Sequence, residues 1–86
     1  MTDIYADKAQ IELAKAINAN GVEVGALTMR EPTVADQLSM QALKGNEGEQ
    51  EVFLFANLCD VEPKAIKSMT LRDYAKLQAA YQSFIA

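Results

Sequence analysis

The side chains that carry out most protein chemistry are scarce in this sequence. Its 86 residues include no histidine and one cysteine, Cys59, which lies in the apolar run EVFLFANLC. A cysteine or serine nucleophile needs a neighbouring base, and imidazole is the usual one. One cysteine without histidine also cannot make a usual zinc site. We therefore expect Cys59 to be a small buried thiol, and we predict no nucleophilic catalysis.

Carboxylates are the remaining candidates for chemistry. Glu47, Glu49 and Glu51 cluster in the stretch GNEGEQE, but their spacing and the missing Asp and Asn ligands do not match a calcium loop. No carboxylate pair is placed to enter a dry cleft, as acid–base catalysis would need. Gly21 and Gly25 lack the spacing and the following helix of a phosphate-binding loop. The sequence therefore predicts no enzyme, no cofactor and no metal site.

Length and hydropathy indicate one small domain. Half of the residues are hydrophobic, which is typical of a globular chain. A chain this short buries only roughly 60–65% of its unfolded surface, so a partner or self-association would add useful burial. The start MTDIYADKAQ lacks the basic and apolar regions of a signal peptide, and no run approaches the ~20 apolar residues of a membrane span. We expect a soluble cytoplasmic protein that does not bind membranes.

The charge of the chain argues against nucleic acid as a partner. The net charge is -4, and no basic stripe interleaves with aromatic residues. Four basic and nine acidic side chains lie up to Cys59, whereas four basic and three acidic ones follow it. We favour two ordinary solvated faces as the explanation. The alternative is that the basic residues of the second part help to dock an acidic partner, and these residues are Lys64, Lys67, Arg72 and Lys76.

The N-terminal part of the chain is expected to form a β-hairpin. Ile11, Leu13 and Ile17 alternate as in a strand, although the same segment also fits an amphipathic helix. The following Asn20-Gly21 pair accepts the positive φ of a two-residue hairpin turn, which favours the strand.

The apolar pattern also constrains the register of this hairpin. A two-residue turn would pair Ile17 with Val24. If that register continued without interruption, apolar residues of one strand would lie opposite polar residues of the other further along the hairpin. A bulge near Gly25 would place Leu27 and Met29 on the core face, so we predict one there.

The stretch ALTMREPTVADQL joins the hairpin to a helix. Pro32 ends the strand because it cannot donate a ladder hydrogen bond. Thr33 can cap a helix, and Asp36 falls at the matching position of a capping box. Arg30 is expected to reach Asp36 or a loop carbonyl and to have a structural role.

Three further helices are expected downstream of the first. Residues 52–59 are apolar nearly all round and should form the most buried helix, although periodicity alone also allows a short buried strand. Pro63 suits the first turn of a short helix that ends near Ser68. Thr70 and Asp73 repeat the Thr-x-x-Asp capping pattern before a last helix over residues 71–84.

The last helix carries an apolar seam formed by Tyr74, Leu77, Tyr81 and Phe84. Core packing explains the seam most simply, but its C-terminal part could be an exposed groove for a partner helix. The start of the helix, Leu71 with Tyr74, is expected to pack inward against residues that include Leu38.

The protein-binding hypothesis places two half-exposed aromatic residues at the end of this helix, with basic residues at the rim. Its members are Arg72, Lys76, Tyr81 and Phe84. The predicted fold class is α+β, with an N-terminal β-hairpin followed by three to four α-helices. Residues 1–10 are expected to be a flexible segment, and residues 11–86 a single small domain.

Two stretches resemble a known family. INANGVEVGALTMREPT, residues 17–33, is similar nearly position by position to a segment of the tail assembly chaperones of Mu-like contractile-tailed bacteriophages. LCDVEPKAIKSMTLRDYAKLQAAYQSFI, residues 58–85, resembles the second half of these proteins. The chain departs from the family at Asp60, where glycine is common, and at Phe53 and Phe55, where small aliphatic residues are common. The resemblance also supports a strand over a helix for residues 11–17.

The resemblance implies a non-catalytic protein that coats the long helical tape-measure protein of a phage tail. Such chaperones keep that protein soluble in the host cytoplasm until tail tube subunits polymerise around it, and they are absent from the finished virion. The tail tube protein and a second copy of the chain are further candidate partners. The competing interpretations are a structural tail component and a small regulatory adaptor.

Overall fold

The computed structural model describes residues 8–86. Its elements are β1 (Lys8–Ala19), β2 (Val22–Arg30), α1 (Val34–Gln41), α2 (Glu47–Cys59), α3 (Pro63–Lys67) and α4 (Leu71–Ile85). One antiparallel hairpin precedes four helices, which confirms the predicted α+β class. Of the predicted flexible segment 1–10, residues 1–7 lie outside the described residues, and the last three residues belong to β1. None of the helices described is long and apolar enough to cross a membrane.

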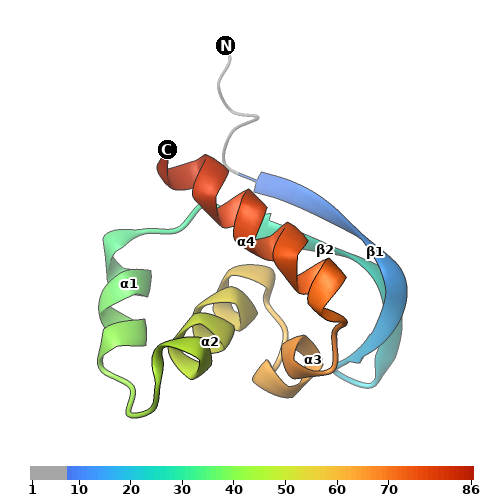
Figure 1. Ribbon diagram of the computed structural model, residues 1–86, viewed down its shortest axis with the longest axis horizontal. Helices are drawn as coiled ribbons and strands as arrows, with labels where there is room; N and C mark the ends of the chain where they lie inside the picture. The colour runs from blue at the N-terminus through green and yellow to red at the C-terminus, as the bar shows by residue number, and fades with distance from the viewer. Residues whose placement is uncertain (1–7) are drawn as a thin grey trace.

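The helices pack on the curved hairpin, and α1 stands at one side of the molecule (Figure 1). Helix α4 crosses the hairpin and contacts β1, while α2 packs against β2 and α3. Helix α1 packs against α2. This arrangement leaves α1 and the end of α4 facing each other across the surface of α2.

The hairpin turn forms as the Asn20-Gly21 pair predicts. Both residues have positive φ, 54° for Asn20 and 84° for Gly21. The Asn18 side chain accepts a hydrogen bond of 3.1 Å from the backbone N–H of Gly21, which stabilises the turn. Ile17 pairs with Val24, the partner expected for a two-residue loop. The segment that sequence patterns left ambiguous is therefore a strand.

The predicted irregularity of the hairpin is present, but its extra residues lie on the other strand. The register shifts between Glu12, which pairs with Ala26, and Ile17, so Gly25 alone lies opposite residues 13–16. Leu27 and Met29 are buried, as the predicted bulge required. The additional residues of β1 break the ladder locally and leave N–H groups that need partners from outside the hairpin.

Helix α2 forms the centre of the core. Its buried residues are Leu54, Phe55, Ala56, Leu58 and Cys59, which confirms the prediction that this helix is the most buried one. Asn46 caps its start by accepting a hydrogen bond of 2.8 Å from the Glu49 N–H. Pro63 opens the short helix α3 at its first turn, where a missing N–H has no cost.

Two expectations about packing are wrong. Leu71 and Leu38 do not pack inward, because their exposed fractions are 85% and 60%. Tyr74 does pack inward, with its ring centroid 5.6 Å from that of Phe55. Helix α1 contains no buried residue, so its apolar face contributes little to the core and much to the surface.

Candidate functional site

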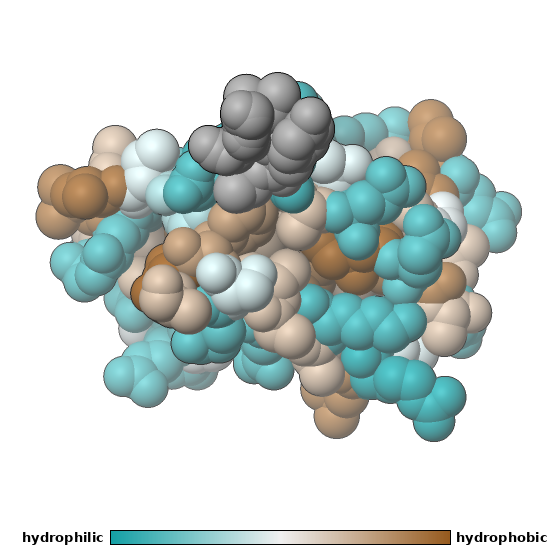
Figure 2. Space-filling view, turned by 90° about the horizontal axis from the view of Figure 1, so that it is seen from above, coloured by the Kyte–Doolittle hydropathy of each residue, from teal (hydrophilic) through white to brown (hydrophobic). Residues whose placement is uncertain are grey.

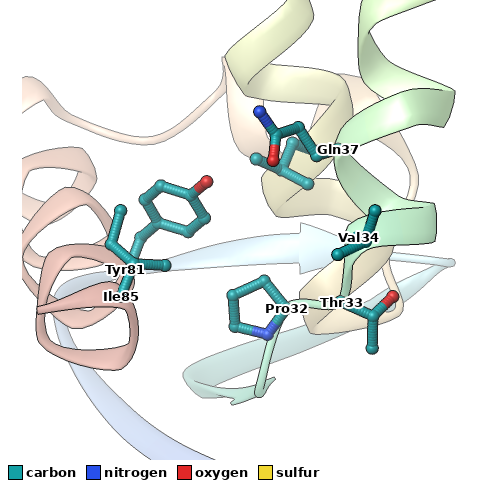
Figure 3. A pocket seen from close by; sticks show the side chains of 7 residues that line it. Pro32, Thr33, Val34, Gln37, Tyr81 and Ile85 are labelled. Atoms are coloured by element: carbon teal, nitrogen blue, oxygen red, sulfur yellow. The ribbon is translucent and has the colours of Figure 1, made fainter.

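An apolar hollow lies between α1 and the C-terminal end of α4 (Figure 3). Its volume is about 170 Å³, and no charged side chain lines it. In Figure 3, Tyr81 and Ile85 of α4 face Val34 and Gln37 of α1, and Pro32 lies at the base between them. The full lining is Pro32, Thr33, Val34, Gln37, Leu54, Tyr81 and Ile85.

The wall formed by α1 is held by polar contacts at the start of the helix. Thr33 and Asp36 form a complete capping box: the Asp36 N–H donates to the Thr33 hydroxyl at 3.3 Å, and the Thr33 N–H donates to the Asp36 carboxylate at 2.8 Å. The Arg30 guanidinium donates to both carboxylate oxygens of Asp36, each at 2.7 Å. These hydrogen bonds fix α1 to the end of β2 without a buried apolar contact.

The Arg30–Asp36 ion pair also sets the protonation of both side chains at the junction of β2 and α1. The hydrogen bonds from Arg30 hold the pKa of the Asp36 carboxyl far below its usual range. Correspondingly, the bond to Asp36 raises the pKa of Arg30. Both groups are therefore charged throughout the neutral range, and the joint does not change its protonation there.

The wall formed by α4 rests on the core. Tyr81 packs its ring against Phe55 with centroids 5.6 Å apart, and buried Leu54 forms the floor beside it. Ile85 keeps 53% of its surface exposed at the rim. A rigid aromatic wall next to an exposed aliphatic rim is suited to an apolar ligand.

A second hollow continues along α1 and shares its floor with the first. Leu54 and Tyr81 line both, and Met40, Gln41, Glu47, Gln50 and Glu51 complete the second. We call the two hollows together the α1–α4 groove. Val34, which lines the first hollow, is 74% exposed, and Leu38, one turn further along α1, is 60% exposed. Figure 2 shows hydrophobic side chains at the left edge of the molecule, the side where α1 lies in Figure 1.

The structure separates the four residues that the sequence grouped as a binding surface. Tyr81 lines the groove, and Phe84 is half-buried against the core. The Lys76 ammonium group donates to the Glu12 carbonyl at 2.8 Å and pairs with Asp73 at 3.2 Å, while the side chain stays 42% exposed. Arg72 lies nine residues before Tyr81, about 14 Å along the helix axis. Arg72 therefore lies away from the aromatic pair.

Sequence patterns missed the α1 side of the groove. The four-residue spacing of Val34 and Leu38 places both on one apolar face of the helix, which by itself indicates only a helix-packing surface. Two features of α1 indicate that this helix packs weakly on the core. It is eight residues long, and Met40 is its only apolar residue that packs against the core, so it has too few apolar contacts to be anchored on both sides.

Two side chains that could react chemically, Cys59 and Tyr74, are buried or hydrogen-bonded. Burial raises the pKa of the Cys59 thiol to about 12, so the thiolate is not populated at neutral pH. Burial and a 2.6 Å hydrogen bond to Glu51 raise the pKa of Tyr74. Residues 8–86 contain no cluster of His, Cys, Asp or Glu that could hold a metal ion.

Comparison with known proteins agrees with a role in assembly. A family model described as "Phage tail assembly chaperone proteins, E, or 41 or 14" matches residues 10–86. The match includes every residue of the α1–α4 groove. Comparisons with curated proteins and with solved structures gave no match.

Proposed function

Because the chain belongs to the phage tail assembly chaperone family, we propose that it binds the phage tape-measure protein and keeps it soluble until the tail tube polymerises. The observation that carries this proposal is the uncharged hollow of the α1–α4 groove, with its rim of exposed aliphatic residues. A tape-measure chain exposes long apolar helical stripes before assembly. A protein that covers them must bind each stretch moderately, in many copies, and then release it.

The groove fits an amphipathic helix as its ligand. Its walls are themselves helices, and helix-in-groove recognition uses apolar anchors spaced three or four residues apart. Tyr81 and Ile85 of α4, which both line the first hollow, have that spacing. Val34 lines the hollow from α1, and Leu38 follows it one turn later as an exposed apolar residue outside the lining. Half-buried Met40 adds an adaptable contact, whereas Met29 is fully buried and is not available to a ligand.

The proposal includes the cell biology of an assembly factor. The chain acts in the host cytoplasm and is absent from the mature virion. A structural tail component would instead remain in purified particles, so mass spectrometry of purified particles distinguishes the two. A small regulatory adaptor would bind one folded partner and would not solubilise an extended helical one.

The test is co-expression with the tape-measure protein encoded in the same phage genome. Val34→Asp with Ile85→Asp places charge on both rims of the groove and alters only exposed side chains. We expect this double variant to fold and to leave most of the client insoluble. Val22→Asp is the matched control, because Val22 is 60% exposed but lies at the hairpin turn.

Two further variants sharpen the result. Tyr81→Ser with Phe84→Ser should also lose the client, although circular dichroism must first establish that this pair still folds, because Tyr81 packs on Phe55. A client that stays fully soluble with the folded Val34→Asp/Ile85→Asp variant would place binding elsewhere on the chain.

A further inference from the structure

A second exposed apolar surface lies at the corner between α3 and α4. Leu71 is 85% exposed, the largest exposed fraction among the large hydrophobic residues of the described chain. It borders a hollow of about 210 Å³ whose other lining residues are Val52, Ile66, Lys67, Met69 and Tyr74. The core leaves this leucine uncovered, so burying it against a partner would gain apolar contact.

Four cations surround this corner. Lys67 lines the apolar hollow and also a neighbouring one with Lys64, while Lys15 and Arg72 line a third beside Thr70. Lys15 comes from β1, so the tertiary structure adds a cation that the sequence analysis had not grouped with the others. None of the four forms an ion pair within residues 8–86, although Asp60 and Glu62 precede α3 in sequence.

Two cations elsewhere in the structure form ion pairs. Lys76 is held by Asp73 and by the Glu12 carbonyl, and Arg30, at the junction of β2 and α1, is held by Asp36. Lys8 and Lys44 also form no ion pair within residues 8–86, but the four cations of the corner lie together, where an apolar residue is also exposed. The positive charge and the exposed apolar surface of this corner both favour a ligand that carries acidic and apolar side chains.

We propose that this α3–α4 corner is a second docking surface, which binds an acidic amphipathic segment of a partner protein. An apolar side chain of the segment packs beside Leu71 and Met69, and its flanking carboxylates pair with Lys64, Lys67 and Arg72. A nucleic acid fits the corner less well, because Tyr74, the aromatic residue of its lining, packs on Phe55 and donates its hydroxyl to Glu51, and these contacts hold the ring against the core.

The corner and the α1–α4 groove can be occupied at the same time. Leu71 and Ile85 lie at opposite ends of α4, about 21 Å apart along the helix axis. The groove is lined at one end by Glu47 and Glu51, so the two surfaces also prefer ligands of opposite charge. This inference does not depend on the tape-measure protein being the ligand of the groove.

The experiment uses two capped synthetic helical peptides. One has leucines four residues apart flanked by glutamates, and its twin has lysine at every glutamate position. Each is titrated into the ¹⁵N-labelled full chain and followed by amide chemical shifts. We expect the acidic peptide to shift amides around Lys67, Met69 and Leu71, with an affinity that falls as salt is added. The lysine twin should leave these amides unchanged.

Variants test the residues directly. Lys64→Glu with Lys67→Glu should weaken binding of the acidic peptide by more than about tenfold, and Leu71→Ser should weaken it without changing its salt dependence. Lys8→Glu with Lys44→Glu makes the same change in net charge away from the corner and should bind normally. Equal binding of both peptides, shifts confined to the α1–α4 groove, or tighter binding of single-stranded DNA would each overturn the proposal.

Discussion

The carboxylate of Asp73 on α4 accepts a hydrogen bond of 2.9 Å from the backbone N–H of Ala14, 59 residues earlier in the chain. It accepts a second one, of 3.1 Å, from Lys15. Asp73 has no exposed surface, and Lys76 provides its counter-charge at 3.2 Å. These N–H groups belong to the irregular part of β1 that the strand ladder leaves open, so one carboxylate ties α4 to the hairpin.

Asp73→Asn should lower the melting temperature markedly. The amide keeps one acceptor oxygen but presents an NH₂ group where the second carboxylate oxygen was, which leaves one strand N–H without its partner. Thermal unfolding followed by circular dichroism measures the effect. Thr70→Ala is the comparison, because it removes only the cap of the same helix, and it should be the milder change. An Asp73→Asn chain as stable as the wild type would show that the bridge contributes nothing.

Stability should fall in acid because the folded state depresses two carboxyl pKa values. The Ala14 N–H is the main cause of the lowered pKa of Asp73, and the Arg30 hydrogen bond is the main cause for Asp36. In the unfolded chain the pKa of an aspartate is about 3.9. The stabilisation is therefore complete above that pH and is lost as the pH falls from there toward the folded pKa values.

Denaturant titrations at a series of acidic pH values measure this slope. The Asp73→Asn and Asp36→Asn variants each remove one of the two groups, so each should flatten the dependence below about pH 4. A wild-type slope that both variants retain would assign the acid sensitivity to other carboxylates.

Thr33→Ala and Thr70→Ala should each cost roughly 0.5–2 kcal/mol. Both hydroxyls accept the N–H three residues on, at 3.3 Å for Thr33 and 3.2 Å for Thr70. Helix α1 has no buried residue, so Thr33→Ala should mainly fray α1 and lie at the low end of that range in global unfolding. Amide hydrogen exchange distinguishes local fraying from global loss, and faster exchange outside α1 in Thr33→Ala would contradict this account.

Arg30→Ala should destabilise the chain by at most about 1 kcal/mol, because the Arg30 side chain is 45% exposed. The larger expected effect is faster amide exchange in α1, whose start the ion pair holds. Arg30→Lys cannot keep both hydrogen bonds to Asp36, so its stability and its α1 exchange rate should lie between those of the wild type and those of Arg30→Ala. Loss of partner binding with unchanged melting and unchanged α1 exchange would refute the structural role and indicate direct contact.

Cys59 should not react with a disulfide reagent in the folded protein. Burial raises its pKa to about 12, so at neutral pH the thiol stays protonated as well as inaccessible. One thiol should become reactive when urea unfolds the chain. Because the folded pKa is raised, this group also stabilises the fold below its unfolded pKa of about 8.5, and that contribution is lost as the pH rises further. Rapid labelling of the native chain would contradict its burial.

The sequence by itself determined the features that a few neighbouring residues decide. Asn20-Gly21 specified the hairpin turn and Pro32 the end of β2, because the allowed φ values of these residues are local properties. Thr33 and Asp36 specified the start of α1, since both partners of the capping box lie within one turn. The order of elements and the fold class follow from such signals.

Only the tertiary structure decided which polar and apolar side chains find distant partners. Asp73 was predicted as the second half of a capping box, and its N–H does receive the Thr70 cap. Its carboxylate, however, turns to β1, which no spacing within the helix could show. Lys76 pairs with this carboxylate and donates to the Glu12 carbonyl, while its own side chain stays 42% exposed.

The same reason explains the exposed apolar residues. An amphipathic period marks Leu38 and Leu71 as apolar but does not say whether another element covers them. Whether another element covers these residues depends on how the helices pack against one another and on the hairpin. That packing is fixed by contacts between residues far apart in the chain. Local rules therefore gave the helices, and the packing of those helices created the two uncovered surfaces.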